Sequence, residues 1–231
     1  MARKKRKHLN PIVKILLLIF IVFLIICNVI FYKGYITYKT ATKEVSIEEK
    51  INDIKAQDNY IKIEDVSEYY KDAVIAVEDH RFYKHKGIDL ISTFEALFSN
   101  IKTQSLGMGG STITQQLAKN MYFSQKKEFT RKVAELFVAL DLEKALTKEE
   151  ILELYVNIIY FGDGYYGIEN ASKGYYGKSA NSLTQEEAIM LAGLPAAPSV
   201  YSPTVNQDLA DQRYKQVESA IKKYGHLKNE N

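Results

Sequence analysis

The stretch KEFTRKVAELFVAL, residues 127–140, indicates the fold class of this chain. Its large apolar side chains recur at helical spacing, at Phe129, Val133, Leu136, Phe137 and Leu140. Lys127, Arg131 and Glu135 follow one another at intervals of four residues, so a helix places them within about 80° of one another on its opposite side. We expect one face of this helix to pack on the core. The other face would present two cations beside a carboxylate.

Capping patterns indicate further helices after this stretch. The pairs Thr147/Glu150 and Thr184/Glu187 have the spacing of capping boxes. The predicted helices cover residues 147–160, 184–194 and 207–224. Alternating strand patterns are scarce, and the hydrophobic content of 46% is typical of a globular chain. The sequence therefore predicts one mainly α domain.

The N-terminus combines a basic tail with a long apolar segment. Residues 1–14 carry six lysines and arginines and no acid, and the 21 residues of 12–32 contain Lys14 as their single charge. A helix of that length rises about 30 Å, the thickness of a bilayer's hydrocarbon core. The positive tail favours a cytoplasmic N-terminus. A cleaved signal peptide is the alternative, but no small-x-small site follows the segment, which favours an uncleaved anchor.

Four segments follow from this pattern. They are a cytoplasmic basic tail at 1–11, a transmembrane helix at 12–32, a connector at 33–66 and a domain at 67–231 on the outer face of the cell membrane. Beyond residue 14 the chain has 25 basic and 28 acidic residues, the reverse of the bias of a nucleic-acid-binding domain. The single cysteine, Cys27, lies in the apolar segment, so thiol catalysis and cysteine-ligated metals are excluded from the exported part.

Residues 78–87, EDHRFYKHKG, place a carboxylate at the end of a predicted helix. Glu78 follows the apolar run AVIAV, and both desolvation and the helix C-terminus disfavour its charged form. Such a carboxylate suits a general base that works near neutral pH. The alternative is an ordinary ion pair with Arg81 or Lys84.

Residues 109–120, GGSTITQQLAKN, place two glycines before a helix N-terminus, which presents free backbone N–H groups to anions. The helix then adds polar groups that suit sugar hydroxyls or phosphate, namely Thr114, Gln115, Lys119 and Asn120. The alternative is a serine N-cap with a solvated polar face. The cations of residues 127–135 are equally open to two interpretations, a diphosphate site or surface salt bridges worth about 0.3–0.5 kcal/mol per pair.

Taken together, these segments resemble the peptidoglycan glycosyltransferases, family 51 of the glycosyltransferases. The matching segments are EDxxFxxHxG at 78–87, GGSTITQQLxKN at 109–120, RKxxE at 131–135 and KEEILELYVNxIYFG at 148–162. The resemblance covers about residues 67–215. It implies a mainly α, lysozyme-like fold with a membrane-associated jaw.

The resemblance also implies an activity, the polymerisation of lipid II into β-1,4-linked glycan strands with release of undecaprenyl diphosphate. Glu78 matches the catalytic base that deprotonates the 4-hydroxyl of the acceptor GlcNAc, and Glu135 matches the second essential glutamate. Residues matching the donor diphosphate site are Lys119, Arg131 and Lys132, with Lys127 as an addition. Residues matching the substrate-contacting positions are Ser111, Thr112, Gln115, Gln116 and Asn120, with Phe82 shaping the site.

The same resemblance implies partners and a cofactor. The partners are lipid II, the growing glycan strand, the bacterial cytoplasmic membrane and other cell-wall synthesis proteins. A divalent cation such as Mg²⁺ would help neutralise the diphosphate, although no ligand spacing indicates one. Three positions depart from the family pattern: His80 replaces an arginine, Ala134 replaces a polar or basic residue, and the last motif retains only Arg213.

Three other classes of protein share some of these features. A bifunctional penicillin-binding protein would add a serine transpeptidase, but the Ser-x-x-Lys patterns here have no accompanying Lys-Thr-Gly or Ser-Asp-Asn, which favours a monofunctional enzyme. A lysozyme-like glycan-cleaving enzyme would use carboxylates without needing a Lys/Arg cluster. A non-catalytic, membrane-tethered wall scaffold would need neither Glu78 nor Glu135.

Overall fold

The computed structural model describes residues 10–103, 109–123 and 129–225. The longer helices are α1 (Pro11–Glu44), α2 (Ile47–Lys55), α3 (Glu68–Glu78), α4 (Leu90–Thr103), α5 (Ile113–Tyr122), α6 (Phe129–Ala145), α7 (Lys148–Ile158), α8 (Ile168–Tyr176), α9 (Gln185–Gly193), α10 (Pro198–Tyr201) and α11 (Gln207–Tyr224). No strand occurs in these described ranges, where Tyr160 and Tyr166 form an isolated antiparallel bridge. The predicted mainly α fold is confirmed.

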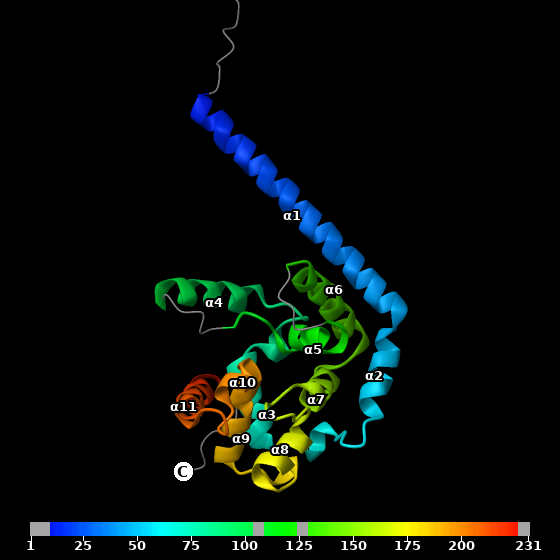
Figure 1. The fold of residues 1–231 in the computed structure, drawn as a ribbon, viewed down its shortest axis with the longest axis vertical. Coiled ribbons are helices and arrows are strands. Elements are labelled where there is room, and N and C mark those ends of the chain that lie inside the picture. Colours follow the sequence, from blue (N-terminus) through cyan, green and yellow to red (C-terminus); the bar gives the residue numbers. More distant parts are fainter. Residues whose placement is uncertain (1–9, 104–108, 124–128, 226–231) are drawn as a thin grey trace, which may run out of the picture.

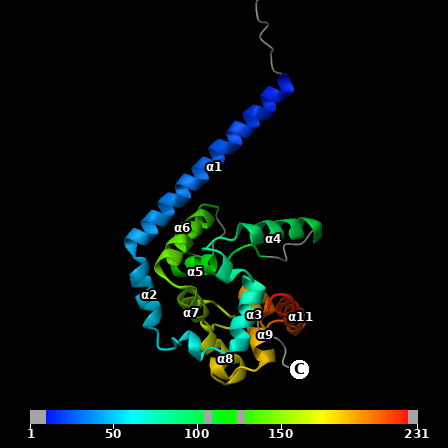
Figure 2. The ribbon, with the colours of Figure 1, turned by 180° about the vertical axis from the view of Figure 1, so that it is seen from behind.

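Helix α1 projects far beyond the rest of the molecule (Figures 1 and 2). Asn10 caps its first turn and Pro11 occupies the first helical position, where proline loses no hydrogen bond. Its apolar side chains are exposed over most of the projecting part, and the helix is long and apolar enough to cross a membrane. The helix does not end with the predicted span but continues through Glu44 into the predicted connector.

The C-terminal part of α1 packs along α6. The ring of Phe137 contacts those of Phe31, Tyr35 and Tyr38, with centroids 5.3–5.5 Å apart. The Tyr38 hydroxyl donates a hydrogen bond of 2.5 Å to Asp141 on α6. Phe137, on the apolar face of α6, therefore packs against the hydrophobic core as expected, and part of what covers it is α1, which the sequence did not predict.

The predicted connector is part of the folded domain. Ile51 and Ile54 of α2 are buried, and α2 packs against α7. The buried carboxylate of Glu153 accepts a hydrogen bond from the Tyr60 hydroxyl and another, of 2.9 Å, from the backbone N–H of Ile63. A carboxylate with several fixed donors offsets the cost of its burial, so Glu153 fastens this segment to the domain.

The core lies among helices from distant parts of the sequence. Helices α5, α6 and α7 pack together on one side, and α3, α9 and α11 pack together on the other. The largest fully buried side chains include Tyr70, Phe82, Tyr155 and Phe161. The capping boxes predicted at Thr147 and Thr184 are both formed. This packing brings the end of α3 beside α5 and α11.

Candidate active site

Glu78 is the last residue of α3, and its carboxylate is held from two sides. Arg213 on α11 forms an ion pair with it, with Nη2 3.2 Å from Oε1, and the Gln116 side chain on α5 donates a hydrogen bond of 2.7 Å to Oε2. The side chain of Glu78 is 10% exposed. The expected alternative partner, Arg81, pairs with Asp89 at 2.7 Å instead.

Glu135 lies on the face of α6 that is turned into the domain. Its side chain is 1% exposed, and two cations of the same helix contact it: Arg131 Nε lies 3.1 Å from Oε1 and Lys132 Nζ lies 3.1 Å from Oε2. Lys132 Nζ also donates a hydrogen bond of 2.8 Å to Ser111 Oγ, in the segment before α5. The RKxxE segment and the GGSTITQQ segment therefore meet in space.

Lys119 on α5 connects the two glutamates electrostatically. Burial lowers the pKa of its ammonium group, while the charges of Glu135 and Glu78 act to raise it. The nearby positive charges of Arg131 and Lys132 lower the pKa of Lys119 further, as burial does. With Arg213, the described residues of this site carry four cations against two carboxylates. Such an excess of positive charge suits a multiply charged anion.

Other residues of the GGSTITQQ segment build the site rather than line it. Thr112 and Gln115 form a capping box at the start of α5, and the Thr112 hydroxyl also donates a hydrogen bond of 2.7 Å to the carbonyl of Gly87. Both side chains are buried. In this structure both side chains hold the helix end, and their contact with substrate stays a prediction.

The remaining predicted residues divide in the same way. Phe82 is fully buried beneath Lys148, so it supports the site from the core. Asn120 is partly buried on α5 beside Lys119. Gln116 and Ser111 contact groups of the site directly. Lys127 lies outside the described residues.

Comparison with known proteins agrees with these motifs. The sequence model of the family described as Transglycosylase matches residues 45–222. The chain belongs to the transglycosylase family. This match begins inside the predicted connector, where α2 packs on the domain.

The relatives of this transglycosylase are of two kinds. It is 48% identical to penicillin-binding protein 1A of Neisseria flavescens over 154 residues, 67% of this chain and 19% of the relative. It is also 47% identical over 155 residues to a protein of Cupriavidus necator described as a transglycosylase, with 67% of each chain covered. The chain thus spans about a fifth of the length of the penicillin-binding proteins it matches.

Within the part of the chain that the structure describes, Asp79, His85 and Asp89 form a cluster with the composition of a metal site. His85 Nε2 lies 2.9–3.0 Å from both carboxylate oxygens of Asp79, and one of these oxygens also accepts the backbone N–H of Ile113. Asp89 accepts hydrogen bonds from Arg81 and Ser92. Mg²⁺ prefers oxygen ligands with retained water, so these engaged groups and the adjacent guanidinium do not fit it. The cluster instead fastens the start of α5.

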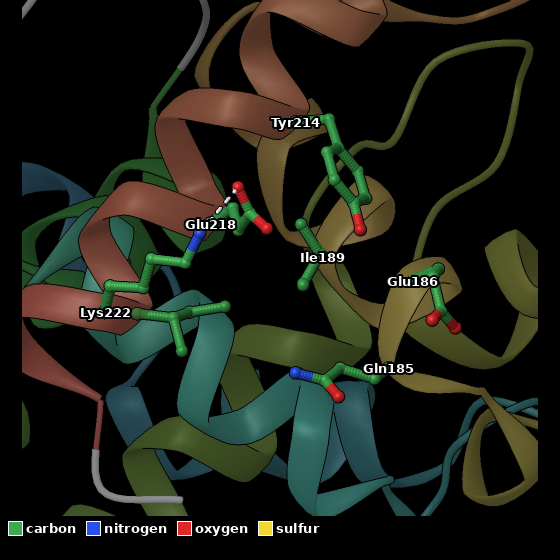
Figure 3. Close-up of a pocket in the computed structure, with 7 residues that line it drawn as sticks. Gln185, Glu186, Ile189, Tyr214, Glu218 and Lys222 are labelled. Carbon is green, nitrogen blue, oxygen red and sulfur yellow. Dashed lines mark ion pairs between the residues drawn. The ribbon is translucent and has the colours of Figure 1, made fainter. Parts of the chain in front are cut away.

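The chain also has a hollow of about 210 Å³ between α9 and α11 (Figure 3). Its lining residues are Gln185, Glu186, Ile189, Tyr214, Glu218, Ile221 and Lys222. Pockets that enclose a ligand usually measure ~300–1,000 Å³, and neither Glu78 nor Glu135 lines this one. We assign it no part in the chemistry.

Proposed function

We propose that this protein polymerises a polyprenyl-diphosphate-linked disaccharide, lipid II, into β-1,4-linked peptidoglycan strands. One observation carries the proposal: two separately held glutamates, on α3 and α6, flank a cluster of cations that includes the partly buried Lys119. A glycan-cleaving enzyme needs two carboxylates but no diphosphate site. The relatives named as penicillin-binding proteins and transglycosylase support the same class.

In this mechanism Glu78 is the general base. It takes the proton of the acceptor's 4-hydroxyl while that oxygen attacks the anomeric carbon of the donor sugar. The bond from this carbon to the diphosphate breaks, and undecaprenyl diphosphate leaves. Attack opposite the leaving group inverts the configuration at carbon, which gives a β-linkage from an α-linked donor.

The cations of α5 and α6 stabilise the leaving group. Lys119, Arg131 and Lys132 converge on the space beside Glu135, and preorganised charges of this kind lower the energy of a developing anion. Glu135 balances two of them and fixes their positions through its 3.1 Å contacts. Any Mg²⁺ at the diphosphate would have to draw its ligands from the substrate and water, because the carboxylates described here are already paired.

The membrane supplies the substrate in this proposal. The described part of the chain exposes large apolar side chains on α4 and at the start of α6, namely Leu90, Ile91, Phe94, Phe98 and Phe129. In both views α4 lies on the side of the domain from which α1 projects (Figures 1 and 2). We propose that α1 spans the cytoplasmic membrane with its N-terminus inside, while α4 dips into the outer leaflet.

The test is polymerisation of labelled lipid II by the full chain in detergent, with Glu78→Gln for comparison. This substitution keeps the size and polarity of the side chain and removes the base. We expect long glycan strands from the wild type and a loss of at least about 10²-fold from the variant. If the folded wild type binds lipid II without polymerising it, the result would refute the proposed activity and favour the non-catalytic scaffold. Release of fragments from purified peptidoglycan would support the cleaving enzyme.

A further inference from the structure

We propose that Arg213 is a positioning residue for the base: it fixes the Glu78 carboxylate so that oxygen Oε2 faces the acceptor hydroxyl. This inference rests on the proposed function. It concerns α11, the last described helix, where Arg213 is the one residue retained from the last family motif.

The Arg213 side chain is fixed on every side. Its Nε donates a hydrogen bond of 3.1 Å to the carbonyl of Gly193, and its Nη1 donates one of 3.1 Å to Gln216 Oε1. Nη2 is left to face Glu78 at 3.2 Å. The ring of Tyr201 lies 5.6 Å from the guanidinium carbon, and the side chain is 11% exposed. Because the guanidinium is held in this way, its position is fixed. The orientation of the Glu78 carboxylate is therefore set by Arg213.

Gly193 on α9 is shaped for this arrangement. A Cβ added there would lie 2.9 Å from Arg213 Cγ, closer than a carbon–carbon contact of about 3.5–4.0 Å allows. The absence of a side chain thus admits the stem of Arg213, while the carbonyl of the same residue orients its head.

The two oxygens of Glu78 have unequal surroundings. Oε1 faces the full charge of Arg213, whereas Oε2 faces the neutral amide of Gln116. A carboxylate oxygen carries two lone pairs, so each retains one for a further partner. The charge-assisted contact to Arg213 holds Oε1 more strongly than the neutral amide of Gln116 holds Oε2. Oε2 is therefore the oxygen that accepts the proton.

Gln116 completes the orientation. The Tyr155 hydroxyl lies 3.4 Å from Gln116 Oε1 and donates to it, which turns the amide nitrogen toward Glu78. Tyr155 is fully buried on α7. The base is thus held between a fixed cation on one oxygen and a fixed amide donor on the other.

Several other charged or titratable groups face Glu78. Lys119 on α5 lies within the electrostatic range of Glu78, whose charge acts to raise the pKa of Lys119 against the lowering effect of burial. Burial raises the pKa of Tyr70 on α3 and of Tyr155 on α7 well above the usual range, so both phenols are neutral. The neighbouring Asp79 is engaged by His85. Arg213 is the directly paired cation among the described groups.

The experiment is the pH dependence of lipid II polymerisation, measured as kcat/KM for the full chain in detergent. The acidic limb of this profile reports the ionisation of the free enzyme's base. We expect Arg213→Gln to move this limb upward by about one pH unit or more, because a neighbouring arginine lowers a carboxyl pKa by about 1–3. Arg213→Lys keeps the charge and should restore most of the shift.

The matched control is Lys222→Gln, which removes one positive charge from the same helix at an exposed position paired with Glu218. This variant should leave both the acidic limb of the pH profile and the polymerisation rate unchanged. If Arg213→Gln does not fold, Gly193→Ala displaces the arginine without removing it, and a smaller shift in the same direction is expected.

The outcomes separate this inference from the proposed function. No polymer from folded wild type ends the proposed function itself. The role of Arg213 is overturned if the wild type makes polymer and the acidic limb of Arg213→Gln lies at the same pH as that of the wild type. The same holds for Gly193→Ala where it replaces Arg213→Gln. A rate of the variant that falls by the same factor at every pH also overturns the role of Arg213, because such a fall reports a structural effect alone.

Discussion

Gly34→Ala tests whether α1 positions the cations and the carboxylate of α6 that we propose to act on the substrate. Gly34 is buried where α1 packs against α6, and an added Cβ would be 2.5 Å from Val133 Cβ and 2.8 Å from the carbonyl oxygen of Thr130. Neither atom is the end of a flexible side chain. A carbon–carbon contact needs about 3.5–4.0 Å, so the two helices must separate by roughly 1 Å.

The magnitude follows from two opposing terms. Alanine in place of glycine inside a helix stabilises by about 0.8–1 kcal/mol. Overpacking of this kind costs about 1–3 kcal/mol, so the net effect is a destabilisation of up to about 2 kcal/mol. For a chain of this size each kcal/mol lowers Tm by about 2–4 °C. A shift of about 1 Å at Arg131 and Glu135 should also lower the rate by as much as 10²-fold.

The assay pairs thermal unfolding in detergent with the initial rate of lipid II polymerisation. Thr37→Ala is the control, because it changes an exposed side chain about one turn further along α1 whose hydroxyl bonds only within the helix. We expect Thr37→Ala to retain the rate of the wild type. A Tm of Gly34→Ala that is equal to or above that of the wild type, with a full rate, would refute the close contact and its role.

Three further predictions concern the site and its supports. Glu135→Gln should lower the polymerisation rate by about 10²-fold or more while the protein stays folded, because Arg131 and Lys132 lose the charge that fixes them; initial rates and thermal unfolding check this. Thr112→Val should cost about 1 kcal/mol through the lost N-cap of α5, seen as a lower Tm with KM unchanged, and an unchanged Tm would contradict it. Burial acts to raise the pKa of Asp89, but hydrogen bonds from Ser92 and Arg81 outweigh it and hold that pKa below the usual range. Its contribution to stability is therefore present above the unfolded pKa of about 3.9 and is lost as pH falls through the folded value, so Asp89→Asn should lower Tm at pH 7 and not at a pH below that folded value.

Much of the fold could be predicted because its signals are local. The capping boxes at Thr147 and Thr184 involve side chains three residues from their partners, and the structure forms both. The apolar stripe of α6 was also identified, but not its partner, because periodicity defines a face without saying what covers it. Long-range packing decided that the stripe meets Phe31, Tyr35 and Tyr38 of α1.

The site shows the same limit. The motifs indicated Glu78, Glu135 and their cations, and the structure brings these groups together. They did not separate Thr112 and Gln115, which cap α5, from Gln116, which reaches Glu78. The contact between Glu78 and Arg213 joins residues 135 positions apart. No sequence spacing reports such a contact, although Arg213 in the remnant of the last motif was a signal.

Helix α1 is continuous from Pro11 to Glu44, and α6 is packed against its later turns. A transmembrane helix tilts when its apolar length exceeds the thickness of the surrounding bilayer. Since no break separates the apolar turns from those that hold α6, such a tilt is transmitted to the cationic cluster as a change in its height above the lipid headgroups. With α1 spanning the membrane as proposed, acyl-chain length becomes a physical control on this protein, and we expect vesicles of graded thickness to change its rate of polymerisation without altering a single residue.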